Sequence, residues 1–196
     1  MRIGRIVLAA LGVLACVVLV MAVTAATKPM PKRASPANLI ARGEHLATVM
    51  SCNDCHTPGS MFGAPDFSRK LSGSELGWQG PWGVTFARNL TPDMETGLGK
   101  WSKEDIVKAL RSGTRPDGSI LQPPMPWQNY TALTDDEAMA IAAYLKSIPA
   151  VSHKVPDRIA PGETASGSYV VFPAPSAWDA PREQAKDVSS GAGKQK

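Results

Sequence analysis

Cys52-Asn53-Asp54-Cys55-His56 is the stretch from which the fold is best inferred. It has the pattern C-x-x-C-H, which is typical of covalent haem attachment. Two thiols three positions apart on one helical turn can each add to one of the two vinyl groups of a haem. The residue that follows then presents its imidazole to the iron from the same side. The pattern predicts one covalent haem c, bound by Cys52, Cys55 and His56, with His56 as an iron ligand.

Three other uses of a cysteine pair compete with this interpretation. A structural disulfide or a thiol redox pair does not need His56, and a thioredoxin-like pair expects a βαβ context that the sequence does not show. A zinc site needs about four ligands. The chain has only 3 Cys and 3 His in 196 residues and no second Cys pair, so the pattern favours haem.

Met125 is the predicted second axial ligand. It lies in Pro124-Met125-Pro126, where prolines on both sides stiffen an extended loop. Such a loop can hold a thioether over the iron, and His/Met ligation suits electron transfer because it raises the reduction potential. Met61 and Met94 in the Gly-rich stretch remain alternatives, and a second histidine, His45, is less favoured.

The N-terminal segment is apolar and flanked by basic residues. Residues 6–27 carry no charge, while Arg2 and Arg5 precede them. A run of about 20 apolar residues is long enough to span a bilayer, but Val23-Thr24-Ala25 also suits a signal-peptide cleavage site. We expect residues 1–33 to be a signal or anchor segment, with retention as a transmembrane helix favoured. Either interpretation predicts an exported domain, on the periplasmic side of the bacterial inner membrane or free in the periplasm.

Start and stop signals predict three helices in the exported part. They begin at Ser35-Pro36, Ser102 and Thr134, and Gly113 and Pro149 end the second and third. The stretch 57–100 is expected to be an ordered loop, with a short hairpin over 78–86 as an option. Residues 151–196 are rich in Pro, Ala, Ser and Gly and are expected to form an irregular, mostly disordered tail that includes His153.

Composition excludes some functions. The net charge is only +4, and two of the basic residues lie in the leader. The remaining excess is too small and too scattered for a nucleic-acid-binding protein. Gly and Pro number 17 each, which indicates long loops.

Several motifs occur in the order typical of one family. The motifs are Gly43-Glu44-His45-Leu46-Ala47, Cys52 to His56 with Thr57-Pro58, Asn89-Leu90-Thr91-Pro92-Asp93, Thr96-Gly97-Leu98-Gly99, Trp101-Ser102, Asp117-Gly118, Pro124-Met125-Pro126 and Leu133 to Lys146. With these motifs the chain resembles a single-haem class I cytochrome c, and it is most similar to the modules of the cytochrome subunits of membrane-bound alcohol and gluconate dehydrogenases.

The resemblance implies an all-α fold, a small helical bundle around the haem that occupies residues 34–150. It implies that the first and last helices cross where Gly43 meets Tyr144. It also places Asn89 and Trp101 at the haem edge, where both are predicted to donate hydrogen bonds to the propionates. Simple core packing is the competing interpretation for Trp101. Those dehydrogenase subunits carry three haem modules, whereas this chain has one attachment motif.

These features together predict an electron carrier with no catalytic residues. The expected partners are redox proteins, with a dehydrogenase as electron donor and a terminal oxidase or another cytochrome as acceptor. The membrane is also an expected partner, through the N-terminal segment. The first alternative is a cytochrome subunit of a membrane-bound dehydrogenase complex. A haem peroxidase, which needs an open iron site, and a sensor are less favoured.

Overall fold

A computed structural model describes residues 35–173. Apart from Ser35, the described residues belong to one compact unit. The predicted signal or anchor segment, residues 1–33, lies outside the described residues. Across residues 35–173 no helix combines the length and the apolar character needed to cross a bilayer.

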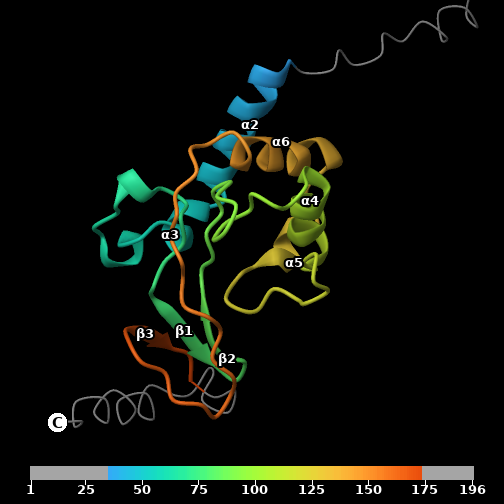
Figure 1. Ribbon diagram of the computed structural model, residues 1–196. Coiled ribbons are helices and arrows are strands. Elements are labelled where there is room, and N and C mark those ends of the chain that lie inside the picture. The colour runs from blue at the N-terminus through green and yellow to red at the C-terminus, as the bar shows by residue number, and fades with distance from the viewer. Residues whose placement is uncertain (1–34, 174–196) are drawn as a thin grey trace, which may run out of the picture. The chain divides into compact units, whose positions relative to one another are not determined.

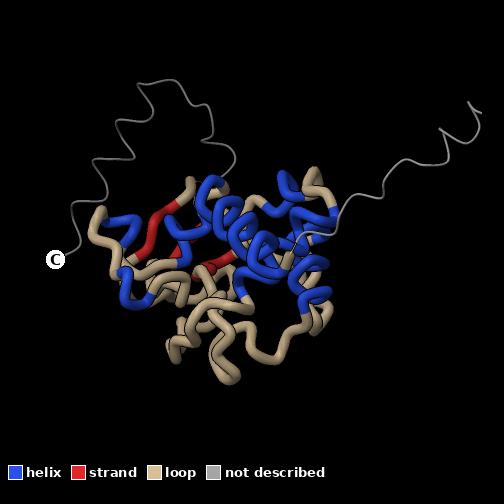
Figure 2. The backbone as a smooth tube through the Cα atoms, turned by 90° about the horizontal axis from the view of Figure 1, so that it is seen from above, coloured by secondary structure: helices blue, strands red, loops and turns tan. Residues whose placement is uncertain are grey.

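The three predicted helices are confirmed and are the longest elements of the unit (Figure 1). They are α2 (Pro36–Val49), α4 (Lys103–Ser112) and α6 (Asp135–Leu145). Shorter elements are α3 (Cys52–His56), η1 (Ser60–Phe62), η2 (Phe67–Arg69) and α5 (Trp127–Tyr130). Figure 2 shows that loops make up much of the remaining chain, in keeping with the Gly and Pro content.

Local capping explains why α4 and α6 begin where they do. The Ser102 side chain accepts from the backbone of Asp105, whose carboxylate accepts from the Ser102 backbone, and Thr134 and Glu137 form the same capping box. These side chains satisfy N–H groups that the first helical turn leaves without partners. Gly113 ends α4 with a φ of 67°, a left-handed conformation that glycine adopts without strain.

Helices α2 and α6 cross at Gly43. A Cβ atom there would overlap the carbonyl group of Ala140 and lie 2.8 Å from the Tyr144 Cβ, so the crossing expected of Gly43 and Tyr144 is confirmed. The core beside it is apolar and draws on α2, α4, α6 and the loops between them. It comprises Ala47, Leu71, Leu98, Ile106, Leu110, Ile141, Ala142, Tyr144 and Leu145.

The fold is not all-α, and this part of the prediction needs correction. Strands β1 (Gly77–Gly80) and β2 (Gly83–Phe86) form the antiparallel hairpin that was an option for this stretch, and β3 (Tyr169–Val171) pairs with β1 in parallel. The order in the sheet is β2-β1-β3. Strands of three or four residues are too short to show a period in the sequence.

The segment predicted to be a disordered tail packs on the unit as far as residue 173. After α6 it runs back along the unit to the sheet (Figure 1). Val155 is only 4% exposed, Ile159 bridges Val84, and the Phe172 ring lies 6.1 Å from Trp78 and 5.6 Å from Trp82. A few widely spaced apolar residues therefore find partners in the hairpin. Residues 174–196 lie outside the described residues.

Candidate functional site

Both cysteines of the C-x-x-C-H motif lie on α3, half-buried and without a disulfide. Burial raises the pKa of the Cys52 thiol to about 11 and also raises the pKa of Cys55. Reactive redox pairs instead contain a thiol of low pKa. Within residues 35–173 no group of three or more His, Cys, Asp or Glu side chains could hold a metal ion. The geometry thus supports neither the redox-pair nor the zinc interpretation.

His56 closes α3 and is only 8% exposed. Its Nδ1 lies 2.7 Å from the carbonyl oxygen of Arg88. Because a carbonyl oxygen only accepts, Nδ1 carries a proton and donates it to this bond. Burial lowers the pKa of His56, with the Arg88 contact acting in the opposite direction. The ring is therefore a neutral imidazole whose Nε2 lone pair remains available, since Nε2 makes no hydrogen bond to any described residue.

The loop after η2 holds the end of α3 in place. The Gly73 N–H donates to the His56 carbonyl over 2.7 Å, and the Leu71 N–H donates to the Thr57 hydroxyl over 3.0 Å. Thr57 is 1% exposed. These bonds fix the direction in which the His56 side chain leaves the backbone.

Tyr130 is a neighbour of the cysteine pair that the sequence analysis missed. It is half-buried in α5 and packs against the apolar core. Burial, together with the two cysteines as potential thiolates, raises the pKa of Tyr130 to about 12. Cys52 and Tyr130 both pack against the same apolar core. Tyr130 belongs to none of the motifs in the sequence. The only signal near it is the Pro-Met-Pro loop that precedes it in the chain.

Met125 lies in the loop between α4 and α5 and is half-buried. The Thr85 hydroxyl donates to the Pro123 carbonyl over 2.7 Å, which fastens this loop to β2. The alternatives are more open to solvent, because Met61 is 47% and Met94 55% exposed. Burial therefore favours Met125 among the three, and its ligation stays a prediction.

Asn89 is 2% exposed and fully engaged within the protein. Its Nδ2 donates to the Thr96 hydroxyl over 3.0 Å and to the Val151 carbonyl over 2.8 Å. Its Oδ1 accepts from the backbone and the hydroxyl of Thr91. A bond to a propionate would require one of these contacts to break. The propionate role predicted for Asn89 stays a prediction, and the contacts give this residue a structural role.

Trp101 is half-buried and packs against the core cluster. Its indole N–H makes no hydrogen bond to any other residue in the described part of the chain. The indole N–H is thus available for the predicted bond to a propionate, which stays a prediction. The ring packs against the core, as the competing interpretation expects.

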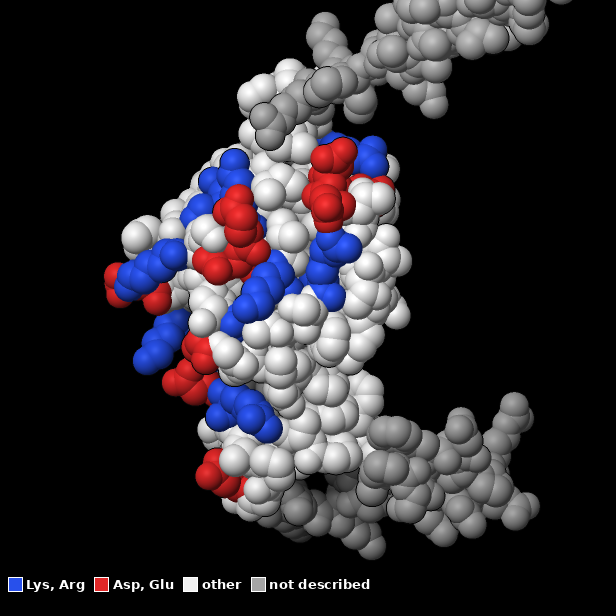
Figure 3. All heavy atoms as spheres, turned by 90° about the vertical axis from the view of Figure 1, so that its right-hand side faces the viewer, with Lys and Arg blue, Asp and Glu red and all other residues white. Residues whose placement is uncertain are grey.

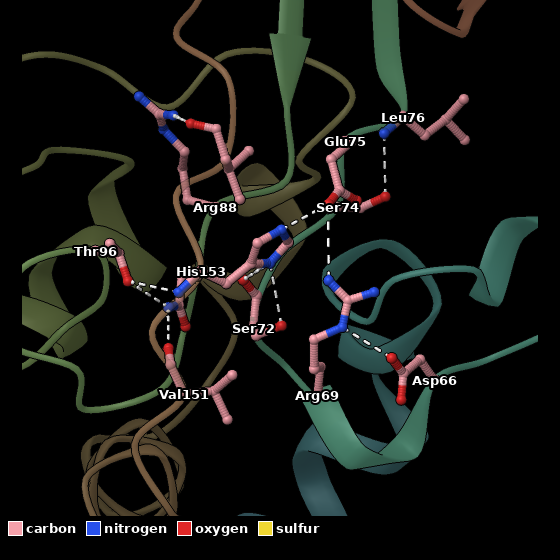
Figure 4. A network of polar contacts seen from close by, with 12 residues as sticks. Asp66, Arg69, Ser72, Ser74, Glu75, Leu76, Arg88, Thr96, Val151 and His153 are labelled. Carbon is pink, nitrogen blue, oxygen red and sulfur yellow. Dashed lines mark hydrogen bonds and ion pairs between the residues drawn. The ribbon is translucent and has the colours of Figure 1, made fainter.

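His153, assigned to the tail in the sequence analysis, lies at the centre of a polar network (Figure 4). Its side chain is 11% exposed, with Nδ1 2.9 Å from the Ser72 carbonyl and Nε2 2.7 Å from Glu75 Oε1. Arg69 continues the network from Glu75 to Asp66. The network joins the segment after α6 to the loop that holds α3, and no sequence spacing signals it.

The geometry agrees with comparisons to known proteins. The cytochrome c family model matches residues 40–149, more than half of the chain. The chain belongs to the cytochrome c family. Membership implies covalent haem c and electron transfer. The residues fit this group, because α3 supplies two free thiols followed by a buried imidazole with an available Nε2.

This cytochrome is similar to subunits of larger enzymes. It is 37% identical over 123 residues to the cytochrome c subunit of a quinone-dependent alcohol dehydrogenase from Gluconobacter oxydans, covering 61% of this chain and 24% of that one. It is 35% identical over 119 residues to the fructose dehydrogenase cytochrome subunit of Gluconobacter japonicus, covering 61% and 23%. A diheme cytochrome c-type protein of Cereibacter sphaeroides is 31% identical over 112 residues, covering 55% and 36%. The chain thus spans about a quarter of the two dehydrogenase subunits.

Proposed function

We propose that this cytochrome carries single electrons through one haem, joined to Cys52 and Cys55, with His56 and Met125 as axial ligands. The observation that carries the proposal is the buried His56 beside two free thiols, with its Nδ1–H on the Arg88 carbonyl. The haem, when bound, supplies an iron that takes up and gives up one electron.

The surrounding residues prepare His56 for this role. The bond from Nδ1 to the Arg88 carbonyl fixes the tautomer and the ring orientation, and it makes Nε2 a better donor. The stiff loop that carries Met125 is fastened to β2, so little order has to be gained when the sulfur approaches the iron. Two protein ligands leave no open position for a substrate, which favours a carrier over a peroxidase.

The cellular setting is part of the same proposal. We place the domain on the periplasmic side of the bacterial inner membrane, anchored by the N-terminal segment or released if that segment is cleaved. An anchor would raise its local concentration near membrane-bound redox partners, namely a dehydrogenase donor and an oxidase or cytochrome acceptor. The face drawn in Figure 3 mixes basic and acidic side chains. This face therefore has no field of a single sign that would steer a distant partner.

A place within a dehydrogenase complex is the second candidate. The relatives favour it, because two of them are cytochrome subunits of fructose or alcohol dehydrogenases. Purification from solubilised membranes tests it. Recovery of a flavin, quinoprotein or molybdenum subunit at equal stoichiometry supports a fixed subunit, and recovery of the cytochrome alone supports a mobile carrier.

Replacement of Met125 tests the axial ligation. In Met125→Ala we expect the haem to stay covalently attached, the iron to bind added cyanide readily, and the thioether-to-iron absorption band to disappear. The reduction potential should fall by a sizeable part of the roughly 0.8 V range that axial ligands span. Redox titration with optical spectra measures both effects, and Met61→Ala and Met94→Ala serve as controls that should behave as wild type.

Two results would contradict the proposal. An unchanged potential in Met125→Ala would remove Met125 from the ligand set. Rapid peroxide turnover by the wild-type protein, together with a spectrum that lacks the thioether band, would favour an enzyme with an open iron.

A further inference from the structure

Arg88 connects the axial histidine to the segment that follows α6. Its carbonyl accepts the His56 Nδ1–H over 2.7 Å. Its guanidinium donates to the carbonyls of Val155 and Pro156 over 3.1 and 2.7 Å, and it contacts the Asp157 carboxylate at 3.0 Å. One residue therefore touches His56 with its backbone and three consecutive residues of this segment with its side chain.

The neighbours of Arg88 are fastened to the same segment. The Asn89 side chain donates to the Val151 carbonyl over 2.8 Å, and the Val151 N–H donates to the Thr91 hydroxyl over 3.1 Å. On either side of Arg88, the Ala87 carbonyl and the Leu90 N–H bond to the loop that holds α3. We call residues 151–157 the brace, because they run along the stretch that carries the Arg88 carbonyl.

The brace is ordered by its own contacts. Val155 is 4% exposed, and His153 is anchored to Ser72 and Glu75, as Figure 4 shows. The family match ends at residue 149, so the brace follows the matched residues. It packs directly behind the residue contacted by His56.

The strength of the bond from Nδ1 to the carbonyl affects the iron. Hydrogen bonds weaken steeply as distance and angle depart from the optimum. A strong bond on Nδ1 makes the imidazole a better electron donor through Nε2, which favours the ferric state and lowers the reduction potential. A carbonyl that is held less firmly leaves Nε2 a weaker donor, and the potential rises.

We propose that the brace, acting through the Arg88 guanidinium, holds the Arg88 carbonyl against His56 and so helps to set the reduction potential. Arg88 is a positioning residue in this scheme. The inference rests on the proposed function, because it takes His56 as the axial ligand.

The test follows the His56 Nδ1–H in the ferric holoprotein. Proton NMR measures its exchange with solvent, and redox titration measures the potential. In Arg88→Lys, which keeps the charge but has fewer directed donors, we expect exchange about tenfold faster and a higher potential, since local opening exposes the proton more often. Asp157→Asn removes the negative charge from one of the three contacts, which weakens it, and should shift exchange in the same direction by a smaller factor.

Arg42→Met is the matched control. It also removes an arginine from an ion pair, with Glu137 at 2.8 Å, but at the crossing of α2 and α6. Exchange of the His56 proton should stay at the wild-type rate in this variant. Exchange and potential that stay at wild-type values in both Arg88→Lys and Asp157→Asn would overturn the proposal, even if the thermal midpoint falls.

The spectrum of the wild-type protein tests the proposed function separately from the positioning role of Arg88. A low-spin spectrum with covalent haem and an imidazole ligand supports the proposed function irrespective of the Arg88 variants. A wild-type protein without that ligand removes the proposed function, and the positioning role with it.

Discussion

The Lys146 side chain makes three hydrogen bonds to a loop that is distant in the sequence. It follows α6, and its Nζ donates to the carbonyls of Leu98, Gly99 and Trp101 at 3.0, 2.9 and 3.0 Å. An ammonium group has three donors, and all of them are used here. The contacts fasten the loop before α4, which also carries Trp101, to the C-terminal end of α6.

Replacing Lys146 by Met should therefore destabilise the domain. The change leaves three carbonyls without their shared donor, and hydrogen bonds to charged groups contribute about 1.5–3 kcal/mol. We expect the free energy of unfolding to fall by about 2–3 kcal/mol in denaturant titrations. Lys103→Met, at an exposed position at the start of α4, should change it little. Equal stability of the two variants would show that the Lys146 contacts contribute nothing measurable.

The sequence identifies some residues well and others not at all. Cys52, Cys55 and His56 stand out in the sequence because the chemistry of covalent haem attachment predicts both their spacing and their residue types. Lys146 and His153 act through partners 45 to 81 positions away. No local pattern encodes such contacts, because they depend on how distant segments pack.

At the scale of elements, the crossing of α2 and α6 organises the core. Gly43 is buried, and the absence of a side chain there lets the two helix backbones approach closely. On α6 the backbone of Ala140 and the Cβ of Tyr144 lie against Gly43, and the buried residues of the helix are Ala138, Ala140, Ile141, Ala142, Ala143, Tyr144 and Leu145. Small residues at the contact and larger ones around it form a tightly packed interface of the kind found in protein interiors.

Gly43→Ala tests this interface. The new methyl group would overlap the Ala140 carbonyl, a backbone atom that can move only if α6 shifts. Overpacking of this kind typically destabilises a protein by about 1–3 kcal/mol, which outweighs the higher helix propensity of alanine. Chemical unfolding of the holoprotein measures the change. Thr48→Ala on an exposed position of the same helix is the control, and a Gly43→Ala variant as stable as wild type would mean that the helices are not in close contact.

Helices were predictable here and strands only in part. Ser102, Thr134, Gly113 and Pro149 mark helix ends through local hydrogen bonding and backbone geometry, which the sequence displays directly. The hairpin was visible as an option because its strands are adjacent. Strand β3 pairs with β1 across about ninety positions, so the all-α expectation failed where pairing is non-local.

At the scale of the whole molecule, the segment after α6 extends the cytochrome domain. Its composition indicated disorder, since Pro, Ser and Gly dominate and apolar residues are sparse. The few that occur, among them Val155, Ile159 and Phe172, contact the region between α3 and α4. A small domain with long loops has little core of its own, and the segment after α6 supplies further apolar contacts.

The state of the two cysteines tests this description most directly. The protein should be purified from its native host, denatured, treated with an alkylating reagent and digested, and the peptide that contains residues 52–56 analysed by mass spectrometry. We expect this peptide to carry the mass of one haem, with neither Cys52 nor Cys55 alkylated. The double variant Cys52→Ala, Cys55→Ala should yield the same peptide without haem. A colourless wild-type protein in which both thiols are alkylated would contradict covalent attachment at this site.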